Sequence, residues 1–303
     1  MHKALSAIRG FERRTIATDR GNIFLHQGGS GPPVLLLHGF PETSLMWHAV
    51  APLLAPGFTV IAADLPGYGA SSCPADAPDH ASMSKREMAA TIIAAMHRLG
   101  YDRFAIVGHD RGGRVAYRAA LDHPEIVTAL AILDVIPTFD VWDKADARLA
   151  LAFWPFSLLA QPAPLPERLL AAAPEAIIDN AFAEWGSPPE VFPASARQVY
   201  IDALRDPAHA HAICEEYRAA ATIDRANDKA DLDAGRRIAC PVLALWSSKS
   251  ALATWYEGEG GPLGLWRRWA GQVDGRAVDG GHFFPEELPD LTADLIRNFL
   301  GGL

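Results

Sequence analysis

The sequence predicts an α/β fold in which helices flank a mostly parallel central sheet and an inserted segment forms a helical lid. Two observations support this fold class. Short, continuous apolar runs alternate with helical patterns through residue 136 and return near the C-terminus, which is typical of parallel strands buried on both faces. Between these parts, residues 137–235 show helical periodicity interrupted by prolines, with no strand-like run.

The predicted elements follow in chain order. Residues 11–27 alternate apolar and polar side chains around the turn signal at 19–21, which predicts a β-hairpin. The glycine cluster at 28–31 precedes a strand instead of a helix, so it is predicted to be a turn and not a phosphate-binding loop. Buried strands are predicted at 34–37, 58–63, 104–107, 129–133 and 242–246.

The clearest helix is predicted at 85–98. Ser84 and Glu87 form a capping-box signal at its start, and Gly100 ends the pattern. The charged stretch from Asp224 to Asp233 lacks calcium-loop spacing and is predicted to be a solvated return from the lid to the core. We therefore expect one structural domain, with core parts at 1–136 and 236–303 and the lid at 137–235.

Composition excludes several classes of protein. The 303 residues are 50% hydrophobic and 21% charged, as in an ordinary globular protein, and the net charge of −9 argues against a nucleic-acid partner. No apolar run approaches the length of a membrane span, and residues 1–14 lack a signal-peptide pattern. The widely spaced cysteines fit neither zinc nor a disulfide scaffold, so we expect reduced thiols, a cytoplasmic location and no metal. The cysteines are Cys73, Cys214 and Cys240.

A candidate nucleophile lies directly after the strand at 104–107. Residues 108–113 read GHDRGG and lead into helical sequence, which is the strand–turn–helix context of a nucleophile elbow and predicts the α/β-hydrolase fold. The central residue is Asp110, where esterases of this fold carry serine. A carboxylate attacks an electrophilic sp³ carbon and forms an ester that water then cleaves. The alternative is that Asp110 only caps the helix.

The remaining catalytic groups are predicted from chain order, which in this fold is nucleophile, acid, histidine. His282 lies in the GGHFFP sequence ahead of a predicted terminal helix, and is the candidate base. The strand at 242–246 is followed by no nearby carboxylate, whereas the strand at 129–133 ends in Asp134. Asp134 is therefore the candidate acid that orients His282, with a turn-capping role as the alternative.

Two further groups complete the predicted site. The backbone N–H groups of Arg111 and Phe40 are expected to form the oxyanion hole. Arg111 directly follows the nucleophile, and Phe40 lies in the loop after the strand at 34–37. Arg111 and Arg114 are predicted to reach the same end of the pocket and to bind a substrate carboxylate. The alternative is that these two arginines balance the negative charge of Asp110 or form ion pairs with acidic side chains on the surface.

Together these motifs resemble the haloacetate (fluoroacetate) dehalogenases of the α/β-hydrolase superfamily, over nearly the whole chain. The resemblance covers the elbow at 108–114, the loop at 38–42 and the lid segment at 159–164, and continues at 214–218 and 281–287. It implies that Asp110 displaces halide from a 2-haloacid, that Arg111 and Arg114 hold the carboxylate, and that Tyr217 donates to the halide. It also implies a homodimer that uses no cofactor.

The lid departs from the family pattern at two positions. Fluoroacetate-cleaving members carry a His-Trp pair there, and this chain has Pro155 and Phe156, neither of which has a donor group. Trp154 is the nearest side chain able to supply an N–H to the halide. We therefore expect chloride or bromide to leave more readily than fluoride.

Two other functions fit the same residues. An epoxide hydrolase shares the Asp nucleophile and His base but needs two lid tyrosines, for which the predicted lid offers Tyr200 and Tyr217. A non-catalytic receptor of the same fold would keep the pocket and bind a ligand without turnover; the complete set of Asp110, Asp134 and His282 argues against it.

Overall fold

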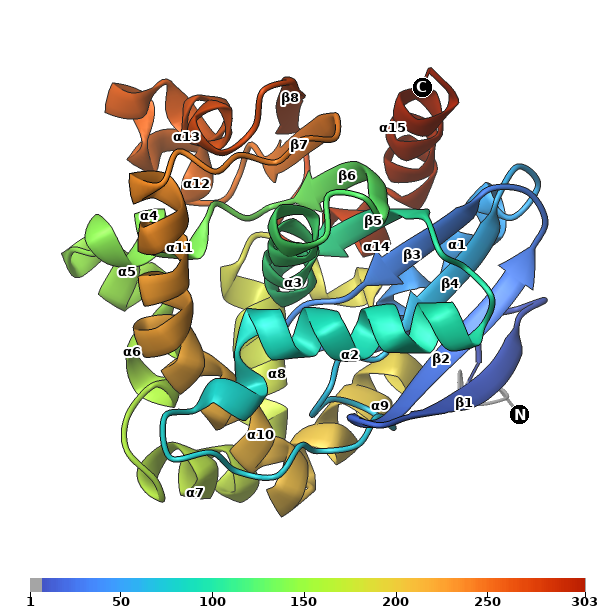
Figure 1. Ribbon diagram of the computed structural model, residues 1–303. Coiled ribbons are helices and arrows are strands. Elements are labelled where there is room, and N and C mark those ends of the chain that lie inside the picture. Colours follow the sequence, from blue (N-terminus) through green and yellow to red (C-terminus); the bar gives the residue numbers. More distant parts are fainter. Residues whose placement is uncertain (1–6, 303) are drawn as a thin grey trace.

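The computed structural model describes residues 7–302, in which eight strands form one sheet with the order β1-β2-β4-β3-β5-β6-β7-β8 (Figure 1). β1 and β2 form the predicted antiparallel hairpin, β2 pairs antiparallel with β4, and every other neighbouring pair is parallel. The strands are β1 (Glu12–Thr18), β2 (Gly21–Gly29), β3 (Pro33–Leu37), β4 (Thr59–Ala63), β5 (Phe104–His109), β6 (Val127–Leu133), β7 (Val242–Ser247) and β8 (Val273–Val278).

The central strands are buried because their residues are apolar on both faces. β3, β4, β5 and β7 are buried along nearly their whole length, which agrees with the runs predicted from the sequence. β8 was not predicted, because it is an edge strand whose residues, with sequence VDGRAV, are mostly exposed and give no apolar run.

Helices of the core pack on this sheet. α2 (Lys85–Arg98) begins where predicted, with the Ser84 hydroxyl accepting the N–H of Glu87 at 3.3 Å. α3 packs against α2, β5 and β6, and α1 packs against α15. The other core elements are α1 (Val50–Leu54), α3 (Asp110–Asp122), α12 (Leu252–Trp255), α13 (Gly261–Trp269), α14 (Phe284–Glu287) and α15 (Pro289–Gly301), with short turns η1 (Ser44–His48), η2 (Ala81–Met83) and η5 (Glu257–Glu259).

The chain between β6 and β7 is helical and contains no strand within the described residues, as its sequence pattern predicts (Figure 1). None of the helices in residues 7–302 combines the length and apolar character needed to cross a membrane. The segment comprises α4 (Thr138–Asp143), α5 (Ala147–Ala152), α6 (Trp154–Leu159), α7 (Leu165–Ala172), α8 (Pro174–Glu184), η3 (Pro189–Val191), α9 (Ala194–Arg205), α10 (Pro207–Ala219), the π-turn η4 (Ala220–Asp224) and α11 (Arg225–Asp233).

The prediction of a solvated return at 224–233 holds only for one face of the segment. Asp224 ends η4 and the rest is helix α11, in which Lys229 and Asp233 are exposed, whereas Asp224, Asp228 and Asp231 are buried. Lys85 of α2 pairs with Asp224, and Arg118 of α3 pairs with Asp231 at 2.6 Å. These cations lie more than a hundred residues earlier in the sequence, so nothing in the local charge pattern reveals that the acids are paired in the interior.

Candidate active site

The turn between β5 and α3 places Asp110 at the carboxyl end of a central strand. Asp110 has a φ of 42°, in the left-handed region that Asp tolerates at a cost of about 1–3 kcal/mol. A Cβ on Gly108 would lie 2.5 Å from the carbonyl oxygen of Gly112, and one on Gly112 would lie 2.5 Å from that of His38. Only glycine fits at 108 and 112, so the GHDRGG sequence folds into a sharp elbow.

Backbone donors and nearby cations surround the Asp110 carboxyl group. The N–H of Phe40 donates to Asp110 Oδ2 at 3.1 Å. Arg111 is the second residue of α3, so its N–H has no acceptor within the helix. Burial alone raises the pKa of Asp110, but the charges of His282, Arg111 and Arg114 outweigh burial and lower the pKa below its ordinary value. Asp110 is therefore ionised and available for attack.

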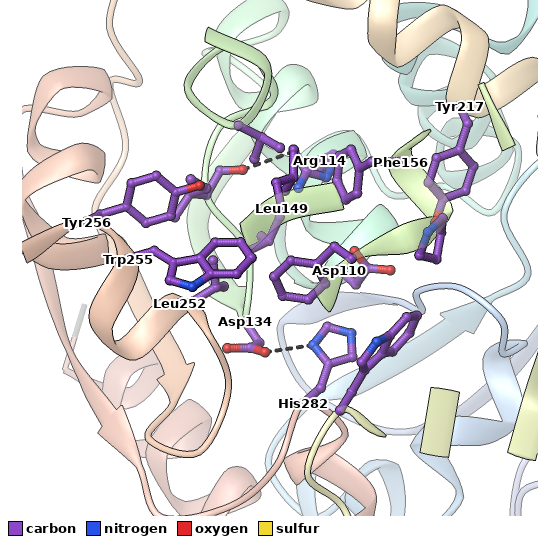
Figure 2. A pocket seen from close by; sticks show the side chains of 16 residues that line it. Asp110, Arg114, Asp134, Leu149, Phe156, Tyr217, Leu252, Trp255, Tyr256 and His282 are labelled. Atoms are coloured by element: carbon purple, nitrogen blue, oxygen red, sulfur yellow. Dashed lines mark hydrogen bonds and ion pairs between the residues drawn. The ribbon is translucent and has the colours of Figure 1, made fainter. Parts of the chain in front are cut away.

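Asp134 and His282 form a buried hydrogen-bonded pair in the same pocket (Figure 2). His282 Nδ1 lies 2.6 Å from Asp134 Oδ2, and the Ser247 N–H donates to Asp134 Oδ1 at 2.7 Å. The main chain around His282 packs closely on the lid, since its N–H donates to the carbonyl of Trp185 at 2.8 Å. With Nδ1 bonded to Asp134, Nε2 is the nitrogen left to act as a base.

The pH dependence of activity follows from this pair. Burial lowers the pKa of His282, but the hydrogen bond and charge of Asp134 outweigh burial and raise the pKa above its usual 6.5. A base must be unprotonated, and His282 acts only on the predicted ester intermediate. The turnover number kcat, which includes hydrolysis of that ester, is therefore expected to fall about tenfold per pH unit below a midpoint higher than 6.5. A pH profile of halide release measures this, and an acid limb with its midpoint below 6 would contradict it.

The two arginines occupy different places. Arg114 lines the pocket, and its Nη1 donates to Ile136 O and Thr138 Oγ1, both at 3.1 Å. Arg111 is buried but is not among the residues that line the pocket. Its guanidinium instead binds Glu216, with Nε at 2.8 Å from Oε2. Arg114 therefore lines the pocket, whereas the Arg111 guanidinium is held by Glu216.

Glu216 is the residue that sequence analysis missed here. It is fully buried on α10 and pairs with both Arg111 and Lys85. Within residues 7–302, Nη1 of Arg111 has no hydrogen-bond partner, and its guanidinium lies 4.0 Å from the ring centre of Tyr217. Arg111 thus connects the elbow to the lid. Glu216 directly precedes Tyr217 in the segment at 214–218, which resembles the dehalogenase family. The sequence does not reveal that Glu216 pairs with Arg111.

The lid contributes Tyr217 and Phe156 to the pocket, but not Trp154. The Phe156 ring lies 5.2 Å from the Arg114 guanidinium. Trp154, the candidate to turn inward and donate an N–H to the halide, is not turned inward: its Nε1 donates to Asn180 Oδ1 at 2.9 Å on the exposed side of the lid. Trp185 lines the pocket, yet its indole N–H donates to the carbonyl of Ala152 at 3.2 Å. The lid wall is therefore aromatic, with Tyr217 carrying the hydroxyl.

An apolar wall completes the pocket on the side away from Tyr217 (Figure 2). Leu252, Trp255 and Tyr256 come from the segment after β7, where sequence analysis noted only the lack of a carboxylate. Leu149 of α5 faces them. The sequence gives little signal for this wall, because its helices are too short to show periodicity.

Two buried glutamates, Glu42 and Glu286, lie next to the site. Glu42 Oε2 lies 3.7 Å from His109 Nδ1, and Glu286 Oε1 lies 3.7 Å from His48 Nδ1. Burial raises the pKa of Glu42, and the neighbouring Glu286 raises it further. Burial also raises the pKa of Glu286, to about 7. The pair therefore holds protons near neutral pH that an unfolded chain would have released.

This pair predicts a loss of stability with rising pH. The folded state binds more protons than the unfolded state between pH 4.5 and about 7, so the free energy of unfolding falls across that window by up to about 1.4 kcal/mol per pH unit for each such group. Glu286→Gln mimics the protonated form and is expected to be more stable than wild type at pH 8, with a smaller difference at pH 5. Denaturant unfolding measures both; equal pH dependence in the two proteins would contradict the prediction.

No group of three or more histidine, cysteine or carboxylate side chains that could hold a metal ion occurs in residues 7–302. The cysteines are free thiols. Burial raises the pKa of each of them, which makes them poor nucleophiles.

Comparisons with known proteins agree with this geometry. The sequence profile of the alpha/beta hydrolase fold family matches residues 32–287. A fluoroacetate dehalogenase from Burkholderia sp is 43% identical over 96% of this chain and 94% of its own length, and a soluble epoxide hydrolase from Corynebacterium sp. (strain C12) is 31% identical over 91% and 92%. These similarities confirm the resemblance drawn from the motifs.

Solved structures show the same relationship. An alpha/beta hydrolase from Nostoc sp PCC 7120 superposes with a TM-score of 0.93 at 45% identity, covering 97% of this chain and 99% of its own. The epoxide hydrolase CorEH superposes with a TM-score of 0.83 at 28% identity, covering 96% and 99%. The sheet order, the elbow at Asp110 and the family match lead to one conclusion: this chain belongs to the α/β-hydrolase fold family.

Proposed function

We propose that the protein hydrolyses short 2-haloacids to 2-hydroxyacids and halide. One observation carries the proposal: the ionised Asp110 and the buried guanidinium of Arg114 line the same pocket. An anionic nucleophile and a cation for the substrate carboxylate are what this reaction requires. The similarity to a fluoroacetate dehalogenase supports the same substrate class.

In the first step, an Asp110 oxygen attacks the α-carbon of the haloacid. A carbon–oxygen bond forms, the carbon–halogen bond breaks, and the halide leaves with the bonding electron pair on the opposite side. Arg114 holds the substrate carboxylate, and the Phe40 N–H holds the other Asp110 oxygen at 3.1 Å. Binding in this orientation supplies much of the rate.

In the second step, His282 Nε2 takes a proton from water, and the resulting hydroxide attacks the carboxyl carbon of the Asp110 ester. Negative charge develops on the carboxyl oxygen, where the N–H groups of Phe40 and Arg111 stabilise it, each by about 3 kcal/mol in comparable sites. Asp134 stabilises the imidazolium at 2.6 Å. When the intermediate collapses, the ester C–O bond breaks and the His282 imidazolium returns its proton to the departing alkoxide oxygen, which gives the hydroxyacid. The carboxyl group of Asp110 loses its proton to solvent and is a carboxylate again.

The lid supplies the hydrogen-bond donors for the departing halide. Tyr217 supplies a hydroxyl, while Phe156 and Pro155 supply none. Fluoride is small and strongly solvated, so it needs more hydrogen bonds than chloride or bromide in order to leave. We propose that bromoacetate and chloroacetate are hydrolysed faster than fluoroacetate.

Halide release from chloro-, bromo- and fluoroacetate by the purified protein tests this function. Release of bromide and chloride with formation of glycolate is the expected result. No halide release from any of the three contradicts the proposal.

The competing function is epoxide hydrolysis, because a soluble epoxide hydrolase from Corynebacterium is 31% identical to this chain. The tyrosine pair it needs is not assembled from the lid residues: Tyr217 lines the pocket, whereas Tyr200 is fully buried and absent from the lining among the described residues. Hydrolysis of styrene oxide that is unaffected by Arg114→Gln would favour this alternative.

Arg114→Gln gives a sharper test of carboxylate binding. Loss of a charged hydrogen-bond donor costs about 1.5–3 kcal/mol, so kcat/KM for bromoacetate is expected to fall about 10- to 100-fold, mainly through KM. Arg205→Gln, at an exposed position on α9, is the matched control and is expected to leave kcat/KM unchanged. An unchanged KM in Arg114→Gln contradicts the role of Arg114.

A further inference from the structure

We propose that the site takes 2-haloacids whose α-carbon carries an apolar substituent, and that this substituent binds in an apolar chamber beside Asp110. The chamber consists of Val141, Leu149, Leu252, Trp255 and Tyr256. The inference rests on the proposed haloacid hydrolysis and adds the substituent and its stereochemistry.

The chamber lies on one side of the nucleophile and the halide position lies on the other. Figure 2 shows Leu252, Trp255 and Tyr256 on the side opposite Tyr217, with Asp110 and Leu149 between them. A haloacetate has three heavy-atom groups at most to place: a carboxylate at Arg114, an α-carbon at Asp110 and a halogen toward the lid. In this arrangement haloacetate presents no alkyl group to the chamber.

Most of the side chains that form the chamber are themselves almost fully buried. Val141, Leu149 and Leu252 are only 3%, 6% and 6% exposed. Leu149 comes from the lid helix α5, and Leu252 from α12 after β7. Apolar walls of this kind bind an alkyl or aryl group by removing it from water, worth about 0.8 kcal/mol per methylene group. That free energy corresponds to about fourfold in kcat/KM for each added methylene group.

A second, separate cavity shares part of the chamber wall. It shares Leu149, Trp255 and Tyr256 with the pocket and is rimmed by charged residues that include Lys144 and Glu259, which form an ion pair. Leu149, Trp255 and Tyr256 therefore form a wall between the chamber and this charged cavity.

The same geometry predicts a stereochemical preference. In-line attack by Asp110 fixes the halogen opposite the nucleophile, and Arg114 fixes the carboxylate. The hydrogen and the apolar substituent then have two remaining positions, and only one faces the chamber. One enantiomer of a 2-bromoalkanoate is expected to react preferentially, with inversion at the α-carbon.

The wild-type enzyme tests the inference with separated enantiomers of 2-bromopropanoate, 2-bromobutanoate and 2-bromopentanoate. These secondary bromides share nearly the same intrinsic reactivity, so differences report binding. We expect kcat/KM to rise about fourfold per methylene group for one enantiomer. Bromoacetate is the reference for the proposed function. If it is hydrolysed while kcat/KM falls along the series for both enantiomers, the chamber inference is overturned. If bromoacetate is not hydrolysed either, the proposed function itself fails.

A larger side chain in the chamber tests whether the substituent of the substrate binds there. Leu252→Phe is expected to lower the ratio of kcat/KM for 2-bromopentanoate to that for bromoacetate by at least tenfold, because the larger ring occupies the chamber. Leu151→Phe is the matched control, since Leu151 lies on α5 beside Leu149 but is 82% exposed, and it is expected to keep the wild-type ratio. A ratio that Leu252→Phe leaves unchanged contradicts the assignment of this wall.

Discussion

Asp110→Asn is expected to reduce halide release from bromoacetate by about 10⁴-fold or more, because an amide cannot displace halide from carbon. Asparagine tolerates the positive φ at this position, so the elbow is expected to keep its shape. Initial rates of bromide release, with far-UV circular dichroism to verify folding, measure the effect. Alanine at the same position provides a second variant that removes the side chain.

The control for this prediction is another aspartate close to the base in sequence. Asp279 is three residues before His282, and its side chain is 90% exposed. Asp279→Asn is expected to retain the wild-type rate. If Asp110→Asn and Asp110→Ala both fold and still release halide at more than a hundredth of the wild-type rate, Asp110 is not the nucleophile.

His282→Ala is expected to separate the two halves of the reaction. Attack by Asp110 needs no base, so one equivalent of bromide per active site is released in a burst. Hydrolysis of the ester then stalls, and steady turnover falls by about 10²–10⁴-fold. Quenched-flow measurement of bromide at high enzyme concentration gives both the burst amplitude and the later rate.

A histidine outside the pocket serves as the control. His123 directly follows the last residue of α3 and is partly exposed beside Glu125, so His123→Ala is expected to show ordinary turnover. A His282→Ala protein that turns over slowly without any burst would mean that histidine is needed before the ester forms, and the two-step account would be wrong.

Much of the site was predictable because its key residues are defined by local context. A short buried strand, an acid between glycines and a following helix identify Asp110 without knowledge of any distant contact. Asp134 follows in the same way, since it ends a core strand. His282 was predicted from the chain order of this fold and from its GGHFFP sequence ahead of the terminal helix. The structure brings these two side chains to 2.6 Å.

The unpredicted features depend on contacts between distant segments. Arg111 and Glu216 are separated by 105 residues, and an arginine beside the nucleophile gives no sign that a lid carboxylate will bind it. Trp154 and Phe156 are two residues apart on a short helix, and only packing decides that Phe156 faces the pocket. β8 has no continuous apolar run, and it is held in the sheet by pairing with β7.

The most direct test of the central claim is to find the covalent intermediate. His282→Ala protein mixed with bromoacetate should gain the mass of one carboxymethyl group, and peptide mapping by tandem mass spectrometry should place that group on Asp110 within the elbow at the start of α3. A carboxymethyl group located on any other side chain, or bromide released with no mass gained by the protein, would contradict the account.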